Sequence, residues 1–205
     1  MIFDDFFIPP IISGIFIDEI KMSLPKDEIK NGNKNDAVPL IAIERHRLLT
    51  DGEGITTLVG FQGCPLRCKY CINKQCWEQN VTAYYTPEQL YEEVKKDNLY
   101  FLYTHGGITF GGGEPGLYPD FIQTFKKVCH SDWKINIETS LNFSIESLQK
   151  LLPIIDCWIV DIKDLDETIY KEYTLSLQKN TTQSHKLQND QGKTMIAKDS
   201  FVPLL

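Results

Sequence analysis

Three cysteines, Cys64, Cys68 and Cys71, form the spacing CxxxCxxC. Thiolates are soft ligands that suit iron–sulfur clusters and zinc. Three of them in one short segment can bind three irons of a [4Fe–4S] cluster and leave the fourth iron open to a small molecule. A structural zinc site needs a fourth ligand, such as Cys76 or a histidine, and usually combines two CxxC pairs, of which this sequence has no second. The spacing therefore favours the cluster over zinc.

Other residues that could do chemistry have plainer interpretations. We expect Cys76 to be a loop thiol, and Cys129 and Cys157 to be buried structural cysteines. Five more residues are expected to be ordinary polar or packing residues: His46, His105, Trp77, Trp133 and Trp158.

Alternating strands and helices must position the cysteines. Apolar and β-branched runs predict four strands: Thr56–Phe61, Gly107–Phe110, Lys134–Glu138 and Cys157–Ile162. Helical spacing and capping residues predict four helices after them: Thr86–Asn98, Pro119–His130, Ser144–Leu152 and Asp166–Tyr173. This alternation predicts an α/β fold of parallel βα units with right-handed crossovers. In such folds functional groups gather at the carboxyl ends of the strands, and the cysteines follow the first strand.

Net charge and composition argue against nucleic-acid and membrane partners. The net charge is −7, and the chain has no block of basic residues, so we expect no nucleic-acid binding. No apolar run is long enough to span a bilayer. The apolar N-terminus does not fit a signal peptide, because Asp4 and Asp5 stand where positive charge belongs and Pro9 and Pro10 interrupt the run. We therefore expect a cytoplasmic protein without a membrane partner.

We divide the chain into three regions by composition. Residues 1–40 are expected to be an apolar arm and a polar linker, and residues 41–174 the core of βα units. Residues 175–205 are a polar tail in which Ser200–Leu205 is a possible fifth strand.

Two glycine- and cysteine-containing motifs resemble those of the radical S-adenosylmethionine (SAM) superfamily. They are CxxxCxxC with Tyr70 before its last cysteine, and the later run Gly111-Gly112-Gly113-Glu114-Pro115. Four further features are similar to glycyl-radical-enzyme activating enzymes such as pyruvate formate-lyase activase: DGEGITTLVGFQGC over Asp51–Cys64, Asn73, DCWIVDIK over Asp156–Lys163, and IYKEYT over Ile169–Thr174. The resemblance covers residues 42–174.

The resemblance implies a site, a reaction and partners. Cys64, Cys68 and Cys71 would bind a [4Fe–4S] cluster with one open iron. The residues implied for binding SAM are Tyr70, Gly112, Gly113, Glu114, Glu138, Thr139, Asp161 and Lys163. The reduced cluster would cleave SAM to a 5′-deoxyadenosyl radical, which would install a glycyl radical on a partner enzyme. A flavodoxin or ferredoxin-type protein would supply the electron, and no side chain is implied as a catalytic acid or base.

The sequence also departs from the family pattern. Glu138 stands where the family usually has Asp, Glu53 where it commonly has Pro, Thr56 where it has Arg, and Leu175 where Gly is expected. The family fold is a partial (βα)6 barrel, and this chain offers about four to five βα units before it stops. Two alternatives therefore stay open: another small radical SAM enzyme, such as an activator of anaerobic ribonucleotide reductase, or a truncated, inactive family member.

Overall fold

A computed structural model describes residues 36–48, 51–78, 83–164, 166–176 and 194–199 of the 205-residue chain. The described strands form one seven-stranded sheet in the order β3-β1-β2-β4-β5-β6-β7. They are β1 (Val38–Leu48), β2 (Ile55–Phe61), β3 (Ala83–Tyr85), β4 (Gly107–Gly112), β5 (Lys134–Thr139), β6 (Cys157–Ile162) and β7 (Thr194–Asp199). Strands β2, β4, β5, β6 and β7 are parallel, whereas β1 is antiparallel to both of its neighbours.

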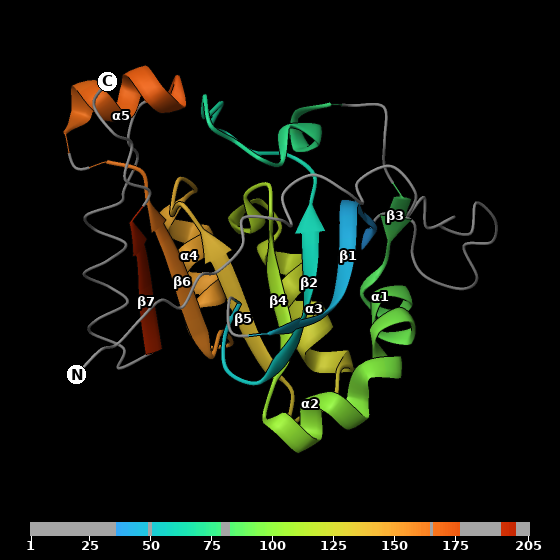
Figure 1. Cartoon of the computed structure of the whole chain (residues 1–205). Helices are drawn as coiled ribbons and strands as arrows, with labels where there is room; N and C mark the ends of the chain where they lie inside the picture. The colour runs from blue at the N-terminus through green and yellow to red at the C-terminus, as the bar shows by residue number, and fades with distance from the viewer. Residues whose placement is uncertain (1–35, 49–50, 79–82, 165, 177–193, 200–205) are drawn as a thin grey trace, which may run out of the picture.

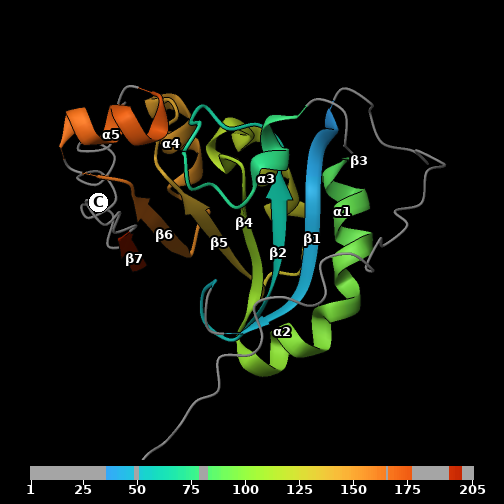
Figure 2. The same ribbon diagram turned by 45° about the horizontal axis from the view of Figure 1, so that its top comes forward.

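Three helices form a layer on the sheet, and two lie at its ends (Figure 1). They are α1 (Pro87–Val94), α2 (Asn98–Thr104), α3 (Pro119–Val128), α4 (Ile145–Leu151) and α5 (Glu167–Thr174), with 3₁₀ turns η2 (Lys74–Trp77), η3 (Lys95–Asp97) and η4 (Pro115–Leu117). Helices α1, α3 and α4 pack side by side on one face of the sheet. Helix α2 lies at the amino ends of the parallel strands, and α5 lies at their carboxyl ends next to β6 (Figure 2).

Strand alternation gives the sheet two unlike faces. Apolar side chains on the helix-covered face form the main core with the helices: Val59, Phe61, Ile108, Phe110, Ile135, Ile137, Trp158 and Val160. The residues between them point to the opposite face and are largely polar, among them Thr109, Asn136, Glu138 and Asp161. The predicted partial (βα) barrel is therefore confirmed as an open sheet, whose edges within the described residues are β3 and β7.

The capping signals in the sequence were informative about helix starts. Thr86 and Gln89 form the capping box of α1, with hydrogen bonds in both directions. The predicted helix over Thr86–Asn98 was wrong at its end, because α1 stops at Val94 and a 3₁₀ turn leads into α2. Helix α2 was not predicted, because Leu99 and Tyr103, which are 76% and 86% exposed, break the amphipathic pattern.

Three strands were not predicted, although β1 and β7 both contain apolar residues that pack on the main core. Strand β7 lies within the polar tail and pairs in parallel register with β6, from Cys157 opposite Thr194 to Ile162 opposite Asp199. Strand β1 runs against β2, and the three-residue β3 runs against β1. The predicted strand at Ser200–Leu205 and the arm and linker over residues 1–35 lie outside the described residues.

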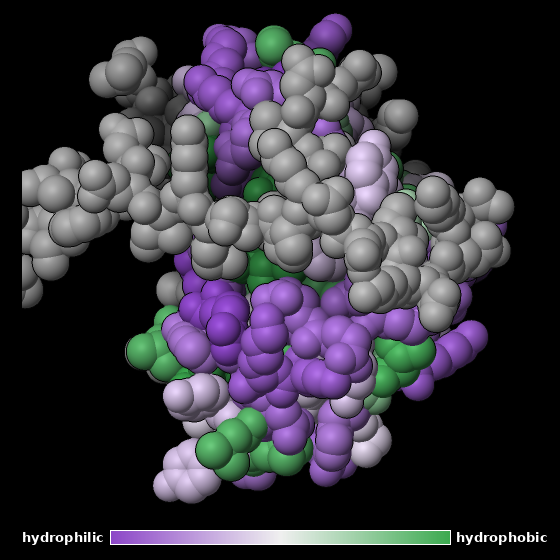
Figure 3. Space-filling model, turned by 90° about the vertical axis from the view of Figure 1, so that its right-hand side faces the viewer, coloured by the Kyte–Doolittle hydropathy of each residue, from purple (hydrophilic) through white to green (hydrophobic). Residues whose placement is uncertain are grey.

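Helix α2 presents an exposed apolar surface at the amino end of the sheet. Leu99, Tyr100, Leu102 and Tyr103 are exposed there. Seen from the side, apolar side chains lie among hydrophilic ones at the lower end of the described surface, where α2 lies (Figure 3). None of the described helices combines the length and apolar character needed to cross a bilayer.

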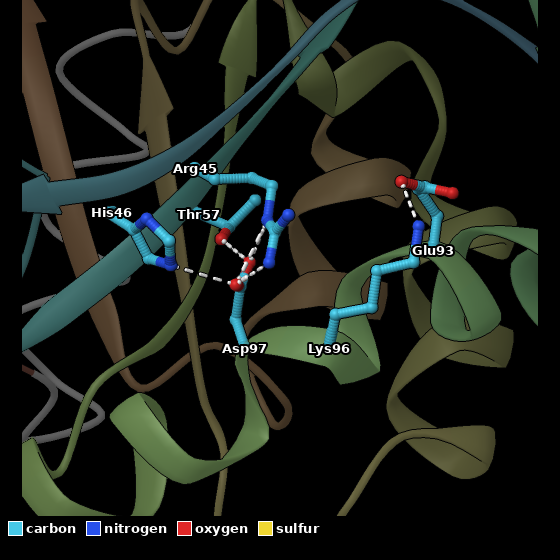
Figure 4. A network of polar contacts seen from close by, with 6 residues as sticks. All are labelled: Arg45, His46, Thr57, Glu93, Lys96 and Asp97. Carbon is cyan, nitrogen blue, oxygen red and sulfur yellow. Dashed lines mark hydrogen bonds and ion pairs between the residues drawn. The ribbon is translucent and has the colours of Figure 1, made fainter.

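A buried carboxylate ties β1 to the helices beneath it. Asp97 accepts hydrogen bonds from Arg45 Nε at 2.9 Å and Thr57 Oγ1 at 2.8 Å, and His46 Nε2 lies 3.0 Å from it (Figure 4). An irregularity in the pairing of β1 with β2 falls between Glu44 and Arg47, where His46 has φ of 59°. Although burial opposes ionisation, the hydrogen bonds from Arg45 and Thr57 hold the pKa of Asp97 below its usual range.

Candidate functional site

The cysteine loop leaves the carboxyl end of β2 and is held from two sides. On one side the main-chain N–H groups of Arg67 and Lys69 donate to the carbonyls of Thr174 and Tyr173 in α5, at 2.8 and 2.9 Å. On the other side Gly63 N–H donates to the carbonyl of Cys76 at 2.8 Å. The loop is therefore fixed between the last described helix and a 3₁₀ turn.

Arg67 also organises the loop from within. Its guanidinium donates to the carbonyls of Cys64 at 2.6 Å and Leu66 at 3.0 Å, and lies over the Trp77 ring, 5.3 Å from its centre. These bonds satisfy carbonyls that the irregular backbone would otherwise leave without partners.

The three thiols of the motif converge on a small apolar cluster separate from the main core. Cys68 is buried with Leu66 and Tyr170, and the partly buried Cys64 and Cys71 pack against them. All three thiols are free. Burial raises the pKa of Cys64 to about 12, with the nearby Glu114 carboxylate adding to the shift, and burial also raises the pKa of Cys68.

The donor chemistry of this loop suits a thiophilic metal group. Within the described ranges, no three cysteine, histidine or acidic side chains already stand in an ion-binding geometry. The thiols nevertheless gather on one small cluster and act electrostatically on one another. A bound metal cation favours the thiolate form, which burial alone disfavours, so metal binding would reverse the raised pKa values. The donor set of Cys64, Cys68 and Cys71 is thus of the chemical kind that iron–sulfur clusters use.

The glycine-rich turn after β4 packs onto the end of β2. Gly113 N–H donates to Phe61 O at 2.9 Å, and Glu114 N–H donates to Gly63 O at 2.8 Å. Gly112 has φ of +86°, and a Cβ on Gly113 would lie 2.1 Å from Gly63 O. Glycine is required at both positions, because a side chain would be strained at the first and would collide with the backbone at the second.

Glu114 is buried in a shell of neutral donors. Its carboxylate accepts hydrogen bonds from Thr139 Oγ1 at 2.6 Å, Gly116 N–H at 3.2 Å, and Ser140 N–H and Oγ at 3.1 and 2.7 Å. Burial raises its pKa, while these hydrogen bonds oppose the shift. Among the described residues no cationic side chain pairs with Glu114. The carboxylate thus joins the turn after β4 to the end of β5.

Two charged residues, Asp161 and Lys163, lie at the carboxyl end of β6, close to Tyr70 of the cysteine loop. The Lys163 ammonium forms an ion pair with Asp161 and lies 5.5 Å from the centre of the Tyr70 ring. Its charge also opposes the rise in the pKa of Cys68. Glu138 lies on the same face of the neighbouring strand β5, where its carboxylate would be 3.5 Å from a Cβ on Gly111.

The structure therefore brings the predicted SAM residues to one end of the sheet in two groups. One group comprises Gly112, Gly113, Glu114 and Thr139. The other comprises Tyr70, Asp161 and Lys163, with Glu138 on the strand between the two groups.

Two residues of the site were not predicted. Ser140 follows Thr139 directly and supplies half of the hydrogen bonds to Glu114, so its place next to a predicted residue was the available signal. Tyr170 lies beneath the thiols, and its hydroxyl accepts a hydrogen bond from Asn142 Nδ2 at 3.3 Å. Burial raises the pKa of Tyr170 to about 12, so it is a neutral support.

Comparison with known protein families identifies the arrangement. The family model described as the radical SAM superfamily matches residues 58–183, from within β2 to beyond α5. The chain belongs to the radical SAM superfamily. The matched region contains the cysteine loop, the glycine-rich turn and the charged end of β6, which are the parts that the site requires.

Within the radical SAM superfamily, the chain is similar to activating enzymes. It is 35% identical over 123 residues to the pyruvate formate-lyase-activating enzyme of Clostridium pasteurianum, covering 60% of this chain and 52% of the relative. It is 25% identical to the (2S)-3-sulfopropanediol dehydratase activating enzyme of Klebsiella oxytoca, covering 68% of this chain and 64% of that protein. The chain thus spans about half the length of the pyruvate formate-lyase-activating enzyme that it matches.

A solved structure supports the fold alone. Streptococcus suis SuiB bound to its precursor peptide SuiA superposes with a TM-score of 0.54 at 17% identity. The match covers 68% of this chain and 31% of SuiB.

Proposed function

We propose that the chain is a radical SAM protein of the glycyl-radical-enzyme activating type. The observation that carries the proposal is the pair of main-chain hydrogen bonds between the cysteine loop and α5. Helix α5 holds the IYKEYT segment that resembles the activating enzymes, so the feature typical of that group supports the metal-binding loop directly. The ribonucleotide reductase activators resemble the chain less, because they usually lack this segment.

In this proposal Cys64, Cys68 and Cys71 hold a [4Fe–4S] cluster through their thiolates. When bound and reduced, the cluster supplies the electron that cleaves SAM into methionine and a 5′-deoxyadenosyl radical. In this proposal the protein supplies binding, orientation and exclusion of water, and no side chain serves as a general acid or base.

We assign the SAM contacts by charge and shape. Lys163 suits the carboxylate of SAM, and Tyr70 beside it offers a ring face to the adenine. The buried Glu114 carboxyl group offers oxygen acceptors to the SAM ammonium group, while Gly112 and Gly113 keep the backbone free of side chains there. Three further polar residues line the site in this proposal: Glu138, Thr139 and Asp161.

The proposal extends to partners and setting. The chemistry that SAM and the cluster would supply is removal of a hydrogen atom from a backbone glycine of a partner glycyl radical enzyme, and a flavodoxin or ferredoxin-type protein would donate the electron. Such chemistry requires anaerobic conditions and fits a cytoplasmic protein. In this proposal residues 41–174 are the radical SAM core, preceded by an arm and linker over residues 1–40 and followed by a divergent tail over residues 175–205.

Anaerobic iron–sulfur reconstitution tests the proposal. We expect the reconstituted chain to produce 5′-deoxyadenosine when dithionite and SAM are added, measured by liquid chromatography. Cys64→Ala, Cys68→Ala and Cys71→Ala should each lose the cluster's absorption spectrum, whereas Cys129→Ala should retain it. A complete cluster without 5′-deoxyadenosine would contradict the proposal and favour an inactive family member. A cluster that survives all three substitutions would contradict the ligand assignment.

A further inference from the structure

An open cavity of about 610 Å³ lies between the cysteine loop and the paired strands β1 and β3. The loop and its 3₁₀ turn contribute Cys64, Arg67 and Trp77 to the lining, and β3 contributes Tyr84, which is 59% exposed. None of the residues predicted to bind SAM lines this cavity. It therefore gives access to a proposed cluster ligand without passing through the proposed SAM site.

Hydrogen bonds hold the strand side of the cavity in place. Gln62 N–H donates to Pro39 O at 3.0 Å, and the Tyr118 hydroxyl donates to Gln62 O at 2.7 Å. Pro39 is paired with Tyr84 in the register of β1 and β3. All four residues line the cavity. Because these contacts lie within the chain, the cavity is formed before any partner binds.

The charge of the cavity is opposite to that of the whole chain. Arg67 is the one charged side chain among the described residues that line it, whereas the chain has a net charge of −7. Arg67 Nη1 donates to the loop carbonyls, and its Nε and Nη2 groups have no hydrogen-bond partner within the described ranges. The Trp77 Nε1 group is buried and also lacks an acceptor there. Two side chains of the lining therefore retain N–H donors for a negatively charged group.

A neighbouring cavity shows that this positive charge is local. It has a volume of about 300 Å³ and shares two lining residues with the first cavity. Its charged lining residues in the described part of the chain are Asp36 and Asp120, of which Asp120 pairs with Lys150 of α4 at 2.9 Å. Glu78 lies next to the cysteine loop in the chain but does not line the first cavity. An acidic partner is therefore favoured at the first cavity and not at the second.

We propose that the cavity beside Cys64 is the docking site of an acidic electron-transfer protein that reduces the cluster. The inference rests on the proposed function in taking Cys64 as a cluster ligand. A carboxylate of the donor protein would accept from the unpaired N–H groups of Arg67 and Trp77, and an apolar edge would pack on Tyr84. Docking here brings the donor beside a cluster ligand and leaves the residues proposed for SAM uncovered.

The step that this docking serves is the transfer of one electron. The donor protein is oxidised by one electron and the cluster is reduced by one. No bond forms or breaks at the docking site, and no proton is transferred there. The residues of the cavity therefore act on the association of two proteins, and their effect is measurable in the absence of SAM.

Binding of flavodoxin to the metal-free chain tests the docking site without any enzymatic activity. Tyr84→Glu places a negative charge in the cavity and should weaken binding by about tenfold at low ionic strength, measured by isothermal titration calorimetry. Tyr84→Lys loses the same ring but adds a positive charge, so it should bind more tightly than Tyr84→Glu. The difference between the two variants should shrink at about 1 M salt, where the Debye length falls to about 3 Å.

A matched control places the same charge far from the cavity. Tyr103 is 86% exposed on α2, which lies at the amino ends of the parallel strands. Tyr103→Glu should therefore bind flavodoxin as wild type does.

Reduction of the reconstituted cluster tests the electron transfer itself. It is followed by electron paramagnetic resonance in the absence of SAM. Reduced flavodoxin should reduce the cluster of Tyr84→Glu about tenfold more slowly than that of wild type at low ionic strength. Reduced methyl viologen is a small cation, so the substitution should not slow it.

Three outcomes would overturn the proposal. The first is equal binding of flavodoxin by Tyr84→Glu and Tyr84→Lys. The second is a loss of binding in Tyr103→Glu as large as that in Tyr84→Glu. The third is a wild-type cluster that methyl viologen reduces but neither flavodoxin nor ferredoxin does. A chain that takes up no cluster contradicts the proposed function instead, and binding to the metal-free chain is measured separately from that result.

Discussion

The two ends of the sheet each bury a carboxylate, but in opposite electrostatic settings. At the amino end Asp97 is met by the Arg45 guanidinium, His46 and Thr57, and its pKa is lowered. At the carboxyl end Glu114 is met only by neutral donors among the described residues, and burial raises its pKa. Asp97 therefore has cationic partners within the protein, whereas Glu114 has none among the described residues.

This difference distinguishes the structural role of Asp97 from the binding role that we propose for Glu114. A buried carboxylate whose partly exposed cationic partners belong to the protein joins two elements, and a ligand cation would have to displace those partners. A buried carboxyl group held only by neutral donors has a raised pKa, and a cation that enters beside it would stabilise its ionised form. The comparison therefore supports Glu114 as part of a binding site and Asp97 as an anchor for β1.

The largest loss of stability is expected from replacing Asp97. Asp97→Ala leaves Arg45 and Thr57 without their shared acceptor and should lower the free energy of unfolding by about 3–5 kcal/mol. Glu93→Ala, which removes the partner of Lys96 in the exposed ion pair nearby, should change it by about 0–1 kcal/mol (Figure 4). Urea denaturation measures both. Equal losses would show that Asp97 is no anchor.

A smaller effect is expected at the other end. Glu114→Gln keeps one acceptor oxygen but turns an amide NH₂ toward donors, so we expect a loss of about 1–3 kcal/mol. No cation is left unpaired by the change, and the loss should stay below that of Asp97→Ala. Glu146→Gln, on an exposed surface of α4, is the matched control for urea denaturation. A Glu114→Gln loss as large as that of Asp97→Ala would remove the distinction between the two ends.

The pH dependence of stability should have opposite signs at the two ends. The folded pKa of Asp97 is lowered, so its contribution is present above the unfolded value of about 3.9 and is lost as pH falls through the folded value. The folded pKa of Glu114 is raised, so its charge destabilises the fold above that pKa. This penalty disappears as pH falls toward the unfolded value of about 4.3.

Denaturation of wild type and two variants across acidic pH measures this. The stability difference between wild type and Asp97→Asn should shrink as pH falls, with a slope of at most about 1.4 kcal/mol per pH unit. Relative to Glu114→Gln, wild type should become more stable as pH falls. Slopes of the same sign would contradict the assignment of the two carboxylates.

The smallest effect is expected at the helix that supports the cysteine loop. Asp166 caps α5 by accepting from the N–H groups of Thr168 at 2.8 Å and Ile169 at 3.0 Å, and its replacement by Ala should cost about 1 kcal/mol. The loop should loosen with the helix, giving faster hydrogen exchange at the amides of Arg67 and Lys69. Ser144→Ala removes the cap of α4 at a similar cost and should leave these two amides unchanged. If hydrogen exchange at these two amides were unchanged in both variants, α5 would not stabilise the cysteine loop.

The sequence by itself determined the chemistry and the regular part of the fold. The spacing of Cys64, Cys68 and Cys71 is a property of a short loop, so it needs no distant contact to be read. The central parts of β2, β4, β5 and β6 were predictable because each strand contains apolar and β-branched residues that are buried in the core. Caps such as Thr86 were predictable because they bond within one helical turn.

Only the tertiary structure decided what depends on residues far apart in the chain. Strand β7, with the sequence TMIAKD, lies in an otherwise polar tail, and its parallel pairing with the distant strand β6 is visible only in the structure. The hydrogen bonds to Glu114 come in part from residues 25 and 26 positions away, and the turn that carries Cys76 folds back so that its carbonyl accepts from the Gly63 N–H. Composition and spacing report which groups a chain owns, but burial and charge pairing follow from which distant groups the fold places beside them.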